Sequence, residues 1–259
     1  MKNQWFEVTQ LSQQLYAISE FKHWEKVVSY LVVGSTKAVL FDTGMGYASI
    51  IEAVSKITNL PVMVLLTHAH WDHIGSAPLF KDVWVFDDKW EIDQLKRGFE
   101  TFEIDELKSK AMFSEGFTPR NYVVSGVQSP KLFKKKKTWQ VNGWQIEAIH
   151  TPGHTPGSVC YVIPKLKVLI GGDTLYPGPI YLQLDESSFE DYFQSVTMLK
   201  KMSVGWEKFK ILPGHNAVVS DIDLIMKIYR CCKRVVNGKN NFSIGNVSLL
   251  TKKGVYGVD

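Results

Sequence analysis

Hydrophobic and polar residues alternate along the first half of the chain in a pattern that predicts strands, then a helix, then further strands. Short β-rich runs separated by turns occupy the first forty residues. From Ile50 to Ile57 apolar residues recur at helical spacing, which predicts a helix over residues 48–58. The predicted strands are Trp5–Val8, Leu15–Ser19, Val27–Gly34, Ala38–Asp42, Val62–Leu66 and Asp82–Phe86, and a second helix is predicted at Asp87–Leu95.

The second half repeats the order of strands followed by a helix, without a close sequence repeat. The dipeptide Asn142-Gly143, typical of tight hairpin turns, separates two of its apolar runs. Residues 98–130 are irregular and predict a long loop or a short helical insert within one domain, residues 1–259. The predicted strands are Thr138–Val141, Trp144–His150, Ser158–Ile163, Lys167–Ile170, Lys210–Leu212, Val247–Thr251 and Val255–Val258, and the predicted helices are Phe189–Met202 and Asp221–Val236, the second capped by Asp221.

Composition places the chain among globular proteins and excludes several other classes. It has 259 residues, of which 45% are hydrophobic and 22% charged, and a formal net charge of +4. So mild a charge argues against a nucleic-acid partner, and no apolar run approaches the length of a membrane span. Three cysteines and an N-terminus without an apolar secretory segment favour a reducing, cytoplasmic location.

The most informative motif is a cluster of histidines and an aspartate after the predicted strand Val62–Leu66. His68, His70, Asp72 and His73 lie within six residues of one another. Four such groups cannot share one face of a helix, but on a loop at the end of a strand they can point into one cavity. Imidazole and carboxylate are ligands typical of zinc and similar cations. The motif therefore predicts a metal site.

Three further candidate ligands each follow a predicted strand within a turn that contains glycine. His154 lies in Thr151–Gly157, Asp173 follows Gly171-Gly172, and His215 follows Gly214. Glycine lets the backbone bend sharply there, so that the side chain of the next residue can turn inward.

These motifs resemble those of the metallo-β-lactamase fold superfamily. Its signature is H-x-H-x-D-H, then a distant His, Asp and His, and all seven positions are filled in this chain. The segment Leu40–Gly44 also matches the D-T-G element upstream of the signature, and the match spans about residues 27 to 216. The resemblance implies an α/β (α+β) fold, a four-layer αββα sandwich with the site at one edge of two packed sheets.

The same resemblance implies two divalent metal ions, zinc, or iron or manganese according to supply. The ligands would be His68, His70 and His154 for the first ion and Asp72, His73 and His215 for the second, with Asp173 bridging the two. Asp42 would orient a ligand histidine. An alternative for Asp42 is a cap of the helix predicted at residues 48–58.

Such a site predicts a metal-dependent hydrolase. Two cations lower the pKa of a water molecule between them, and the resulting hydroxide attacks an electrophilic carbonyl or phosphoryl group. Asp72 is the candidate catalytic residue, because its carboxylate can hold or shuttle the proton of that water.

By the same resemblance, the true β-lactamases carry cysteine or histidine at the position of Asp173. The aspartate therefore excludes those branches. A carboxylate there resembles the glyoxalase II, lactonase, thioesterase and phosphodiesterase branches. Since only residues 216–259 follow His215, glutathione is not the expected carrier. We expect hydrolysis of an acyl thioester or a lactone. The alternatives are a phosphodiesterase or nuclease, a β-lactam hydrolase, a mononuclear iron persulfide dioxygenase and a metal-binding scaffold without activity.

Substrate contacts are less specific in the sequence. Trp24, Tyr176 and Tyr181 are candidates for binding a small-molecule substrate. The aromatic residues of the insert at about 98–130 are compatible with an acyl pocket, with local packing or with a homodimer contact. The four lysines Lys134–Lys137 are compatible with a site for phosphate groups or with a solvated sheet edge.

Overall fold

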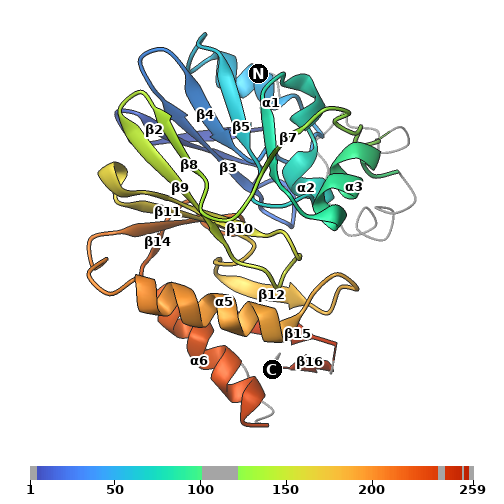
Figure 1. The fold of residues 1–259 in the computed structure, drawn as a ribbon, viewed down its shortest axis with the longest axis vertical. Coiled ribbons are helices and arrows are strands. Elements are labelled where there is room, and N and C mark those ends of the chain that lie inside the picture. Colours follow the sequence, from blue (N-terminus) through green and yellow to red (C-terminus); the bar gives the residue numbers. More distant parts are fainter. Residues whose placement is uncertain (1–4, 101–121, 239–242, 253, 257–259) are drawn as a thin grey trace. The chain divides into compact units, whose positions relative to one another are not determined.

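The computed structural model of the chain describes residues 5–100, 122–238, 243–252 and 254–256. These residues form two compact units, within residues 1–133 and 134–259, each built from β-sheet and helices (Figure 1). The single domain expected from the sequence stays a prediction. The middle of the expected insert, residues 101–121, lies outside the described residues.

The first unit is built on a mixed seven-stranded sheet in which the strands follow one another in sequence order. Its first four strands pair antiparallel through short turns, and the remaining pairs are parallel. Parallel neighbours need longer connections, which contain the helices. The elements are β1 (Glu7–Ser12), β2 (Leu15–Ser19), β3 (Val28–Val33), β4 (Ala38–Phe41), α1 (Ile50–Ser55), β5 (Val62–Leu65), α2 (Trp71–Ile74), a 3₁₀ turn (Ala77–Leu79), β6 (Val83–Phe86), α3 (Lys89–Arg97) and β7 (Lys131–Phe133).

Within residues 5–100, the α-helices α1, α2 and α3 contribute to one hydrophobic core with the sheet. Leu40 and Val64 come from adjacent strands, and Ile50, Ile74 and Leu95 come from α1, α2 and α3. None of these five side chains is exposed to solvent. The short helix α2 is therefore fixed by its buried residue Ile74, since four residues are too few to form a stable helix alone.

The second unit contains a six-stranded sheet, in the order β14-β13-β11-β10-β9-β8, and a three-stranded sheet, in the order β12-β15-β16. The strands β8 to β11 are joined as antiparallel hairpins, and β11 pairs with β13 in parallel. The elements are β8 (Thr138–Val141), β9 (Trp144–His150), β10 (Val159–Ile163), a 3₁₀ helix (Pro164–Leu166), β11 (Val168–Gly172), β12 (Gly178–Leu182), α5 (Phe189–Met202), β13 (Lys210–Pro213), β14 (Ser220–Asp221), α6 (Leu224–Val236), β15 (Val247–Thr251) and β16 (Gly254–Tyr256).

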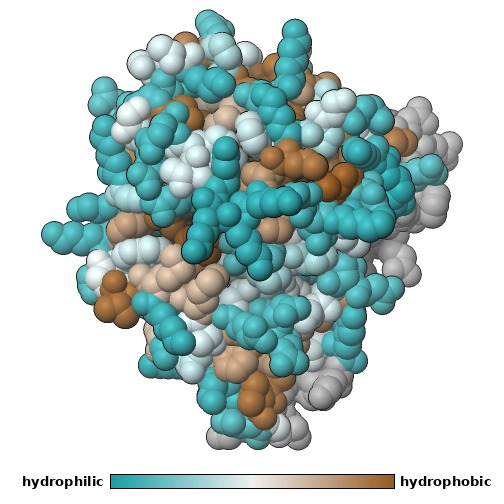
Figure 2. All heavy atoms as spheres, viewed as in Figure 1, coloured by the Kyte–Doolittle hydropathy of each residue, from teal (hydrophilic) through white to brown (hydrophobic). Residues whose placement is uncertain are grey.

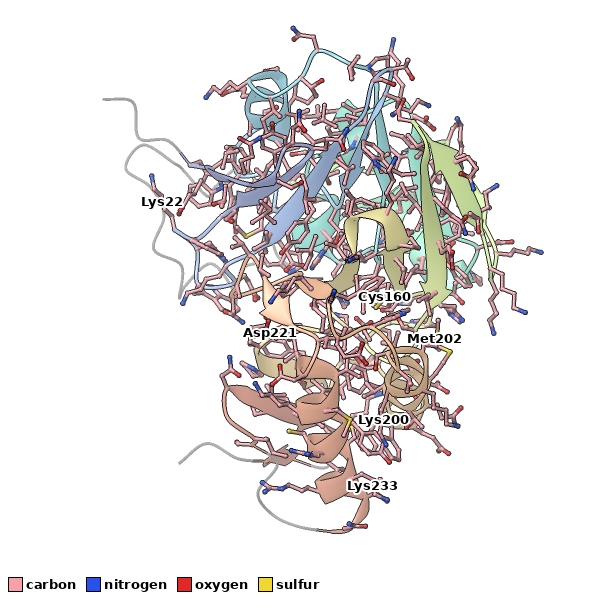
Figure 3. All side chains as sticks on the ribbon, turned by 90° about the vertical axis from the view of Figure 1, so that its left-hand side faces the viewer. Lys22, Cys160, Lys200, Met202, Asp221 and Lys233 are labelled. Carbon is pink, nitrogen blue, oxygen red and sulfur yellow. The ribbon has the colours of Figure 1, made fainter. Side chains whose placement is uncertain are left out.

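Helices α5 and α6 lie side by side and cover the core of the second unit (Figure 1). Val196 of α5 and Ile228 of α6 pack in one cluster with Cys160 and Leu169 of the larger sheet. Cys160 is fully buried, as expected of a core residue, and burial raises the pKa of its thiol to about 11. Figure 3 labels Cys160 in its strand.

Most predicted elements are present, some with the predicted bounds and others with ends displaced by one to three residues, but two assignments at element ends are wrong. Trp5 and Phe6 are buried side chains that precede β1, so the strand begins at Glu7. Asp221 does not cap α6, because it belongs to β14 and its carboxylate accepts a 2.5 Å hydrogen bond from Lys210 Nζ.

The sequence patterns also missed α2, β7, β12 and β14, which are elements of two to five residues. Elements that short show no complete period of hydrophobicity. Strand β12 was hidden further by Gly178-Pro179, a dipeptide that predicts a turn.

The two ends of the expected insert meet. Phe99 and Val124 exchange backbone hydrogen bonds of 2.9 and 3.0 Å, and Val127 N–H donates to Leu95 O at 2.7 Å. Phe99 and Val124, on either side of the residues that are not described, therefore pair with each other within the first unit.

The visible face in Figure 2 is mainly hydrophilic, with hydrophobic residues in small separate patches. Among the residues that the structure describes, no helix combines the length and the apolar character needed to cross a membrane.

Substitution of two glycines of the second unit by alanine should separate the stability cost of backbone strain from that of steric collision. Gly143 has a φ of +78° in the β8–β9 turn, where a Cβ atom would meet open space up to Lys165 Nζ at 4.0 Å. Gly153 has a φ of +142°, and a Cβ atom there would lie 2.3 Å from the Tyr192 Cα atom in α5. Gly143→Ala should cost about 1 kcal/mol of unfolding free energy through strain alone.

Gly153→Ala should cost roughly 3 kcal/mol or more, because the strain adds to overpacking. Urea unfolding of both variants and the wild type measures the difference. Equal losses in the two variants would contradict the contact between the Gly153 turn and α5.

Candidate metal centre

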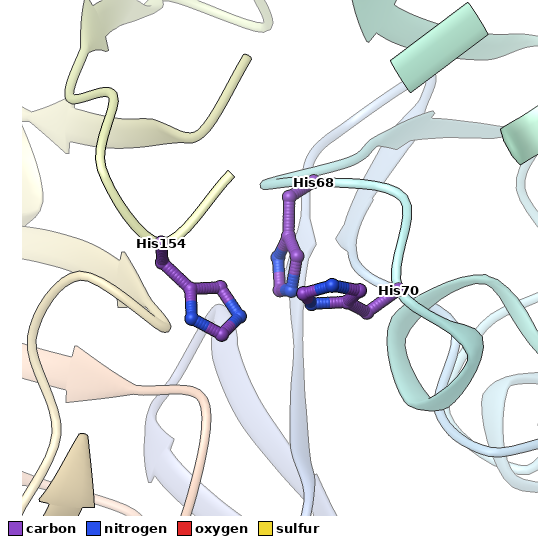
Figure 4. Close-up of side chains that lie close together, drawn as sticks. All are labelled: His68, His70 and His154. Carbon is purple, nitrogen blue, oxygen red and sulfur yellow. The ribbon is translucent and has the colours of Figure 1, made fainter. Parts of the chain in front are cut away.

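The four candidate ligands of the first motif follow β5, which has a parallel neighbour on each side in the first unit. His68 and His70 lie on the loop after β5, and Figure 4 shows their side chains on that segment. Asp72 and His73 lie on α2, so the expectation that the whole motif forms a loop is wrong. All four side chains are buried, with exposed fractions of 1%, 9%, 6% and 0% in sequence order.

These four side chains converge. The ring centre of His68 is 4.8 Å from that of His70 and 4.2 Å from that of His73. Asp72 Oδ2 is 3.7 Å from His73 Nε2. The side chains at positions 1, 3, 5 and 6 of the motif therefore point towards one another because the motif is part loop and part short helix. A regular helix would point them to different sides.

Asp42, at the end of β4, holds this arrangement in place. Its carboxylate accepts hydrogen bonds from the backbone N–H of Thr67 (2.7 Å), the hydroxyl of Thr67 (2.8 Å) and Nδ1 of His73 (2.9 Å). Helix α1 begins after Ser49, so Asp42 does not cap it and the capping alternative is wrong. Asp42 thus contacts a candidate ligand histidine, as the resemblance implies.

The hydrogen bonds also fix which ring nitrogen carries a proton in two histidines of this unit. The Thr67 hydroxyl donates its single proton to Asp42, so its oxygen accepts from His68 Nδ1–H, 3.0 Å away. His73 Nδ1–H donates to the carboxylate of Asp42. In both rings Nε2 then carries the lone pair that a metal ion requires.

The loop that follows Asp42 is tied to α2. The backbone N–H and the hydroxyl of Thr43 both donate to His73 O, at 2.7 and 2.9 Å, and Gly75 N–H donates to Gly44 O at 2.8 Å. On its other side, Met45 N–H donates to Glu20 Oε1 at 2.9 Å. The D-T-G element is therefore a bridge between α2 and the end of β2.

In the second unit, the three remaining candidate ligands lie at the ends of three strands. His154 follows β9, Asp173 follows β11 directly, and His215 follows β13. Asp173 Oδ2 is 3.4 Å from His154 Nε2, and Asp173 Oδ1 is 3.0 Å from His215 Nε2. All three are buried, so the two histidines converge on one carboxylate within this unit.

Backbone contacts set the orientation of His154, which Figure 4 also shows. Its Nδ1 lies 2.8 Å from the carbonyl oxygen of Tyr181, which can only accept, so Nδ1 carries the proton and Nε2 the lone pair. Ser187 Oγ–H donates to His154 O at 2.7 Å. Tyr181 therefore contributes its main chain to the candidate centre.

The expected substrate contacts stay predictions. Trp24 lies between β2 and β3, with its ring 5.5 Å from that of His23. Tyr176 is 1% exposed, its hydroxyl donates to Pro179 O at 2.5 Å, and its ring lies 5.1 Å from that of His215.

Sequence reasoning missed three residues that support the candidate ligands. Thr67 links Asp42 to His68, as described above. Glu91 of α3 is fully buried and accepts a 2.6 Å hydrogen bond from Ala69 N–H, between two candidate ligands. Glu20 is 1% exposed and accepts from Trp5 Nε1–H at 2.5 Å as well as from Met45. The position of Thr67 before the motif and that of Glu20 after a buried strand could have indicated these two residues. No sequence pattern indicates Glu91.

The chain belongs to the metallo-β-lactamase superfamily, whose profile matches residues 24–215. The fold and the convergent histidines and aspartates agree with that assignment, and the protein is a metal-dependent hydrolase. The predicted family is confirmed.

Among curated relatives, the human acyl-coenzyme A thioesterase MBLAC2 is 28% identical over 229 residues, which are 82% of this chain and 81% of the relative. The probable metallo-hydrolase YqgX of Bacillus subtilis is 26% identical over 193 residues, 74% of this chain and 82% of the relative. Both names fit a hydrolase, and the first names a thioester substrate for that relative.

Solved structures confirm the fold class. A metallo-β-lactamase family protein of Thermus thermophilus matches with a TM-score of 0.68 at 20% identity, covering 88% of this chain and 82% of that one. The BLEG-1 B3 metallo-β-lactamase matches with a TM-score of 0.61 at 22% identity, covering 85% and 96%. The α/β arrangement with mixed sheets is thus the metallo-β-lactamase fold.

Glu20 provides a test that is independent of catalysis. Burial raises the pKa of its carboxyl from 4.5 to about 7, against the hydrogen bonds from Trp5 and Met45, which lower it. Between these two values the unfolded chain has lost the proton while the folded chain retains it, so rising pH destabilises the fold. The loss should reach about 3 kcal/mol near pH 7 and stay constant above it.

Glu20→Gln removes this titration, because glutamine stays neutral. We expect the wild type to lose stability relative to the variant as pH rises from about 4.5 to 7, measured by urea unfolding across that range. A constant difference between the two proteins over the range would show that Glu20 ionises normally.

Asp42→Asn tests the buried network. The amide offers one acceptor oxygen and turns an N–H₂ group towards a donor, so His73 loses its fixed orientation. Affinity for Zn²⁺, measured by competition with a chelator, should fall about 10- to 100-fold. Asp93→Asn is the matched control, since Asp93 is an exposed residue of α3. Equal affinities of the two variants would exclude a supporting role for Asp42.

Proposed function

We propose that the protein hydrolyses acyl thioesters or lactones with two divalent metal ions. The proposed metal ligands are the seven residues of the family signature: His68, His70, Asp72, His73, His154, Asp173 and His215. Asp173 would bridge the ions. The donor set supports the proposal, because it consists of imidazoles and carboxylates, the ligands that zinc, iron and manganese accept.

The observation that carries the proposal is the protonation pattern of the histidines. In His68, His73 and His154, Nδ1 donates a hydrogen bond to a hydroxyl, a carboxylate and a backbone carbonyl, respectively. Each contact leaves Nε2 as the nitrogen with a lone pair. Metal-ligating histidines almost always donate their second ring N–H in this way, so three of the five proposed ligand histidines have the orientation that a metal site requires.

When bound, the metal ions would lower the pKa of a water molecule and provide a hydroxide nucleophile near neutral pH. Asp72 would accept and move the proton, and the burial of its carboxylate beside His73 supports this role. A thiol nucleophile is not required. Cys160 does not provide one, because its thiol is fully buried and its pKa is raised to about 11.

Thioesters are favoured by leaving-group chemistry and by the relative. A thiolate leaves without prior protonation, since the pKa of its acid is about 8.5, whereas an amine needs a proton. The human relative at 28% identity is named an acyl-coenzyme A thioesterase. Zinc as the resident metal, lactone hydrolysis, a cytoplasmic location and a homodimer stay predictions.

A substrate panel tests the function. We expect kcat/KM for acyl-coenzyme A thioesters or lactones to exceed that for β-lactams and for bis-nitrophenyl phosphate on the same preparation. Elemental analysis should give about two equivalents of metal. Asp173→Asn should abolish turnover, and Asp185→Asn, which changes an exposed aspartate of the same unit, should not.

Two outcomes would contradict the proposal. Efficient phosphodiester hydrolysis with negligible thioester and lactone hydrolysis would assign the protein to the nuclease or phosphodiesterase branch. One equivalent of iron, unchanged by added metal, together with oxygen consumption on a persulfide substrate, would indicate a dioxygenase.

A further inference from the structure

A groove of about 670 Å³ lies in the second unit, between the β8–β9 edge of the larger sheet and helix α5. Its apolar lining comes from Ile149 and Pro152 on one side and from Met198 and Met202 on the other. Figure 3 labels Met202 at the end of α5. A groove lined in this way accommodates a flat or flexible organic group as well as water.

Three lysines border the groove. Lys135, Lys136 and Lys137 precede β8, and Ala148 N–H of β9 donates to Lys137 O at 2.9 Å, which fixes the turn against the sheet. Lys137 Nζ also lies 5.7 Å from the ring centre of Trp139. Glu147 and Asp191 line the groove too, so its five charged side chains sum to a net charge of +1. Polar groups for hydrogen bonds come from Thr138, His150, Gln194 and Ser195.

The charge of the whole unit has the same sign. Residues 134–259 contain 17 Lys and Arg against 10 Asp and Glu, a formal net charge of +7, whereas residues 1–133 contain 13 against 16, a net charge of −3. The modest +4 of the full chain therefore conceals an uneven distribution. Such a unit attracts anions to its surface before any specific contact forms.

The groove is connected to a candidate metal ligand along the chain. His150 and Pro152 line it, and His154 follows on the same segment. Four residues span at most about 14 Å, which limits the separation of His150 and His154. The groove therefore lies close to the carboxyl end of β9, within the length of a long flexible ligand.

We propose that this groove binds the phosphorylated nucleotide of a coenzyme A-type thioester, with the lysines at its phosphate groups and the adenine over the apolar lining. The proposal rests on the proposed thioesterase function. Coenzyme A thioesters match the site chemically, because a long flexible chain joins their anionic nucleotide to their thioester. The nucleotide can bind the lysines while the thioester extends towards His154. A neutral acyl ester or a lactone would have no use for the lysines.

Binding of adenosine 3′,5′-bisphosphate, a nucleotide fragment without a thioester, tests the groove separately from catalysis. The variant Lys135→Gln/Lys136→Gln/Lys137→Gln should bind it about 10-fold or more weakly than the wild type by calorimetry at low salt. The control Lys165→Gln/Lys208→Gln/Lys233→Gln removes the same charge from exposed lysines outside the groove lining. Figure 3 labels Lys233 on α6.

Loss of binding in the groove variant with retention in the control supports the proposal. Failure of the wild type to bind the bisphosphate, or equal weakening in both variants, overturns it. The Tm of each variant shows whether a loss comes from unfolding.

Kinetics distinguish failure of the groove from failure of the proposed function. The ratio of kcat/KM for an acyl-coenzyme A to that for the same acyl group on N-acetylcysteamine should fall about 10-fold in the groove variant, through KM. An unchanged ratio overturns the groove while the thioesterase function stands. If the wild type hydrolyses neither thioester, the thioesterase function fails, and the bisphosphate titration still decides whether the groove binds the nucleotide.

Discussion

The buried carboxylate of Asp42 is the constraint on which the first unit's candidate ligands depend. A carboxylate that is 2% exposed must be matched by donors, because an unpaired buried charge costs several kcal/mol. Its three donors belong to Thr67 and His73, so satisfying one charge fixes the end of β5 and the orientation of α2 together. The φ of +58° at Asp42 shows that the backbone adopts an uncommon conformation to reach them.

In the second unit, His154 reaches the same tautomer without a carboxylate at its Nδ1. A backbone carbonyl, that of Tyr181, accepts from His154, and its position depends on β12, which pairs with β15. The turn carrying His154 is in turn held to α5, because Ser195 Oγ–H donates to Pro152 O and Ser188 N–H donates to Gly153 O. Ligand geometry here follows from tertiary packing, so mutations distant from the histidines can disturb it.

This difference explains which parts could be predicted from the sequence. The candidate ligands, the long strands and helix α5 carry local patterns, and all of them are visible in the sequence. The supporting groups depend on contacts between distant segments. The Glu91 carboxylate accepts a hydrogen bond from Ala69 N–H, 22 residues away, and His154 donates to the backbone carbonyl of Tyr181, a group that every residue has. No residue type marks such a contact. The four-residue α2 was missed because its helix depends on burial of Ile74 rather than on periodicity.

Neither the fold nor the ligand set decides the substrate, because the superfamily uses both for many reactions. What distinguishes members must lie in residues outside the ligand set. In this chain one such feature is the distribution of charge, which places an excess of lysine and arginine in the unit that carries His154, Asp173 and His215. A hydrolase of uncharged substrates gains nothing from that excess, whereas a hydrolase of anionic thioesters gains faster and tighter binding. The charge distribution therefore favours an anionic carrier over a neutral ester.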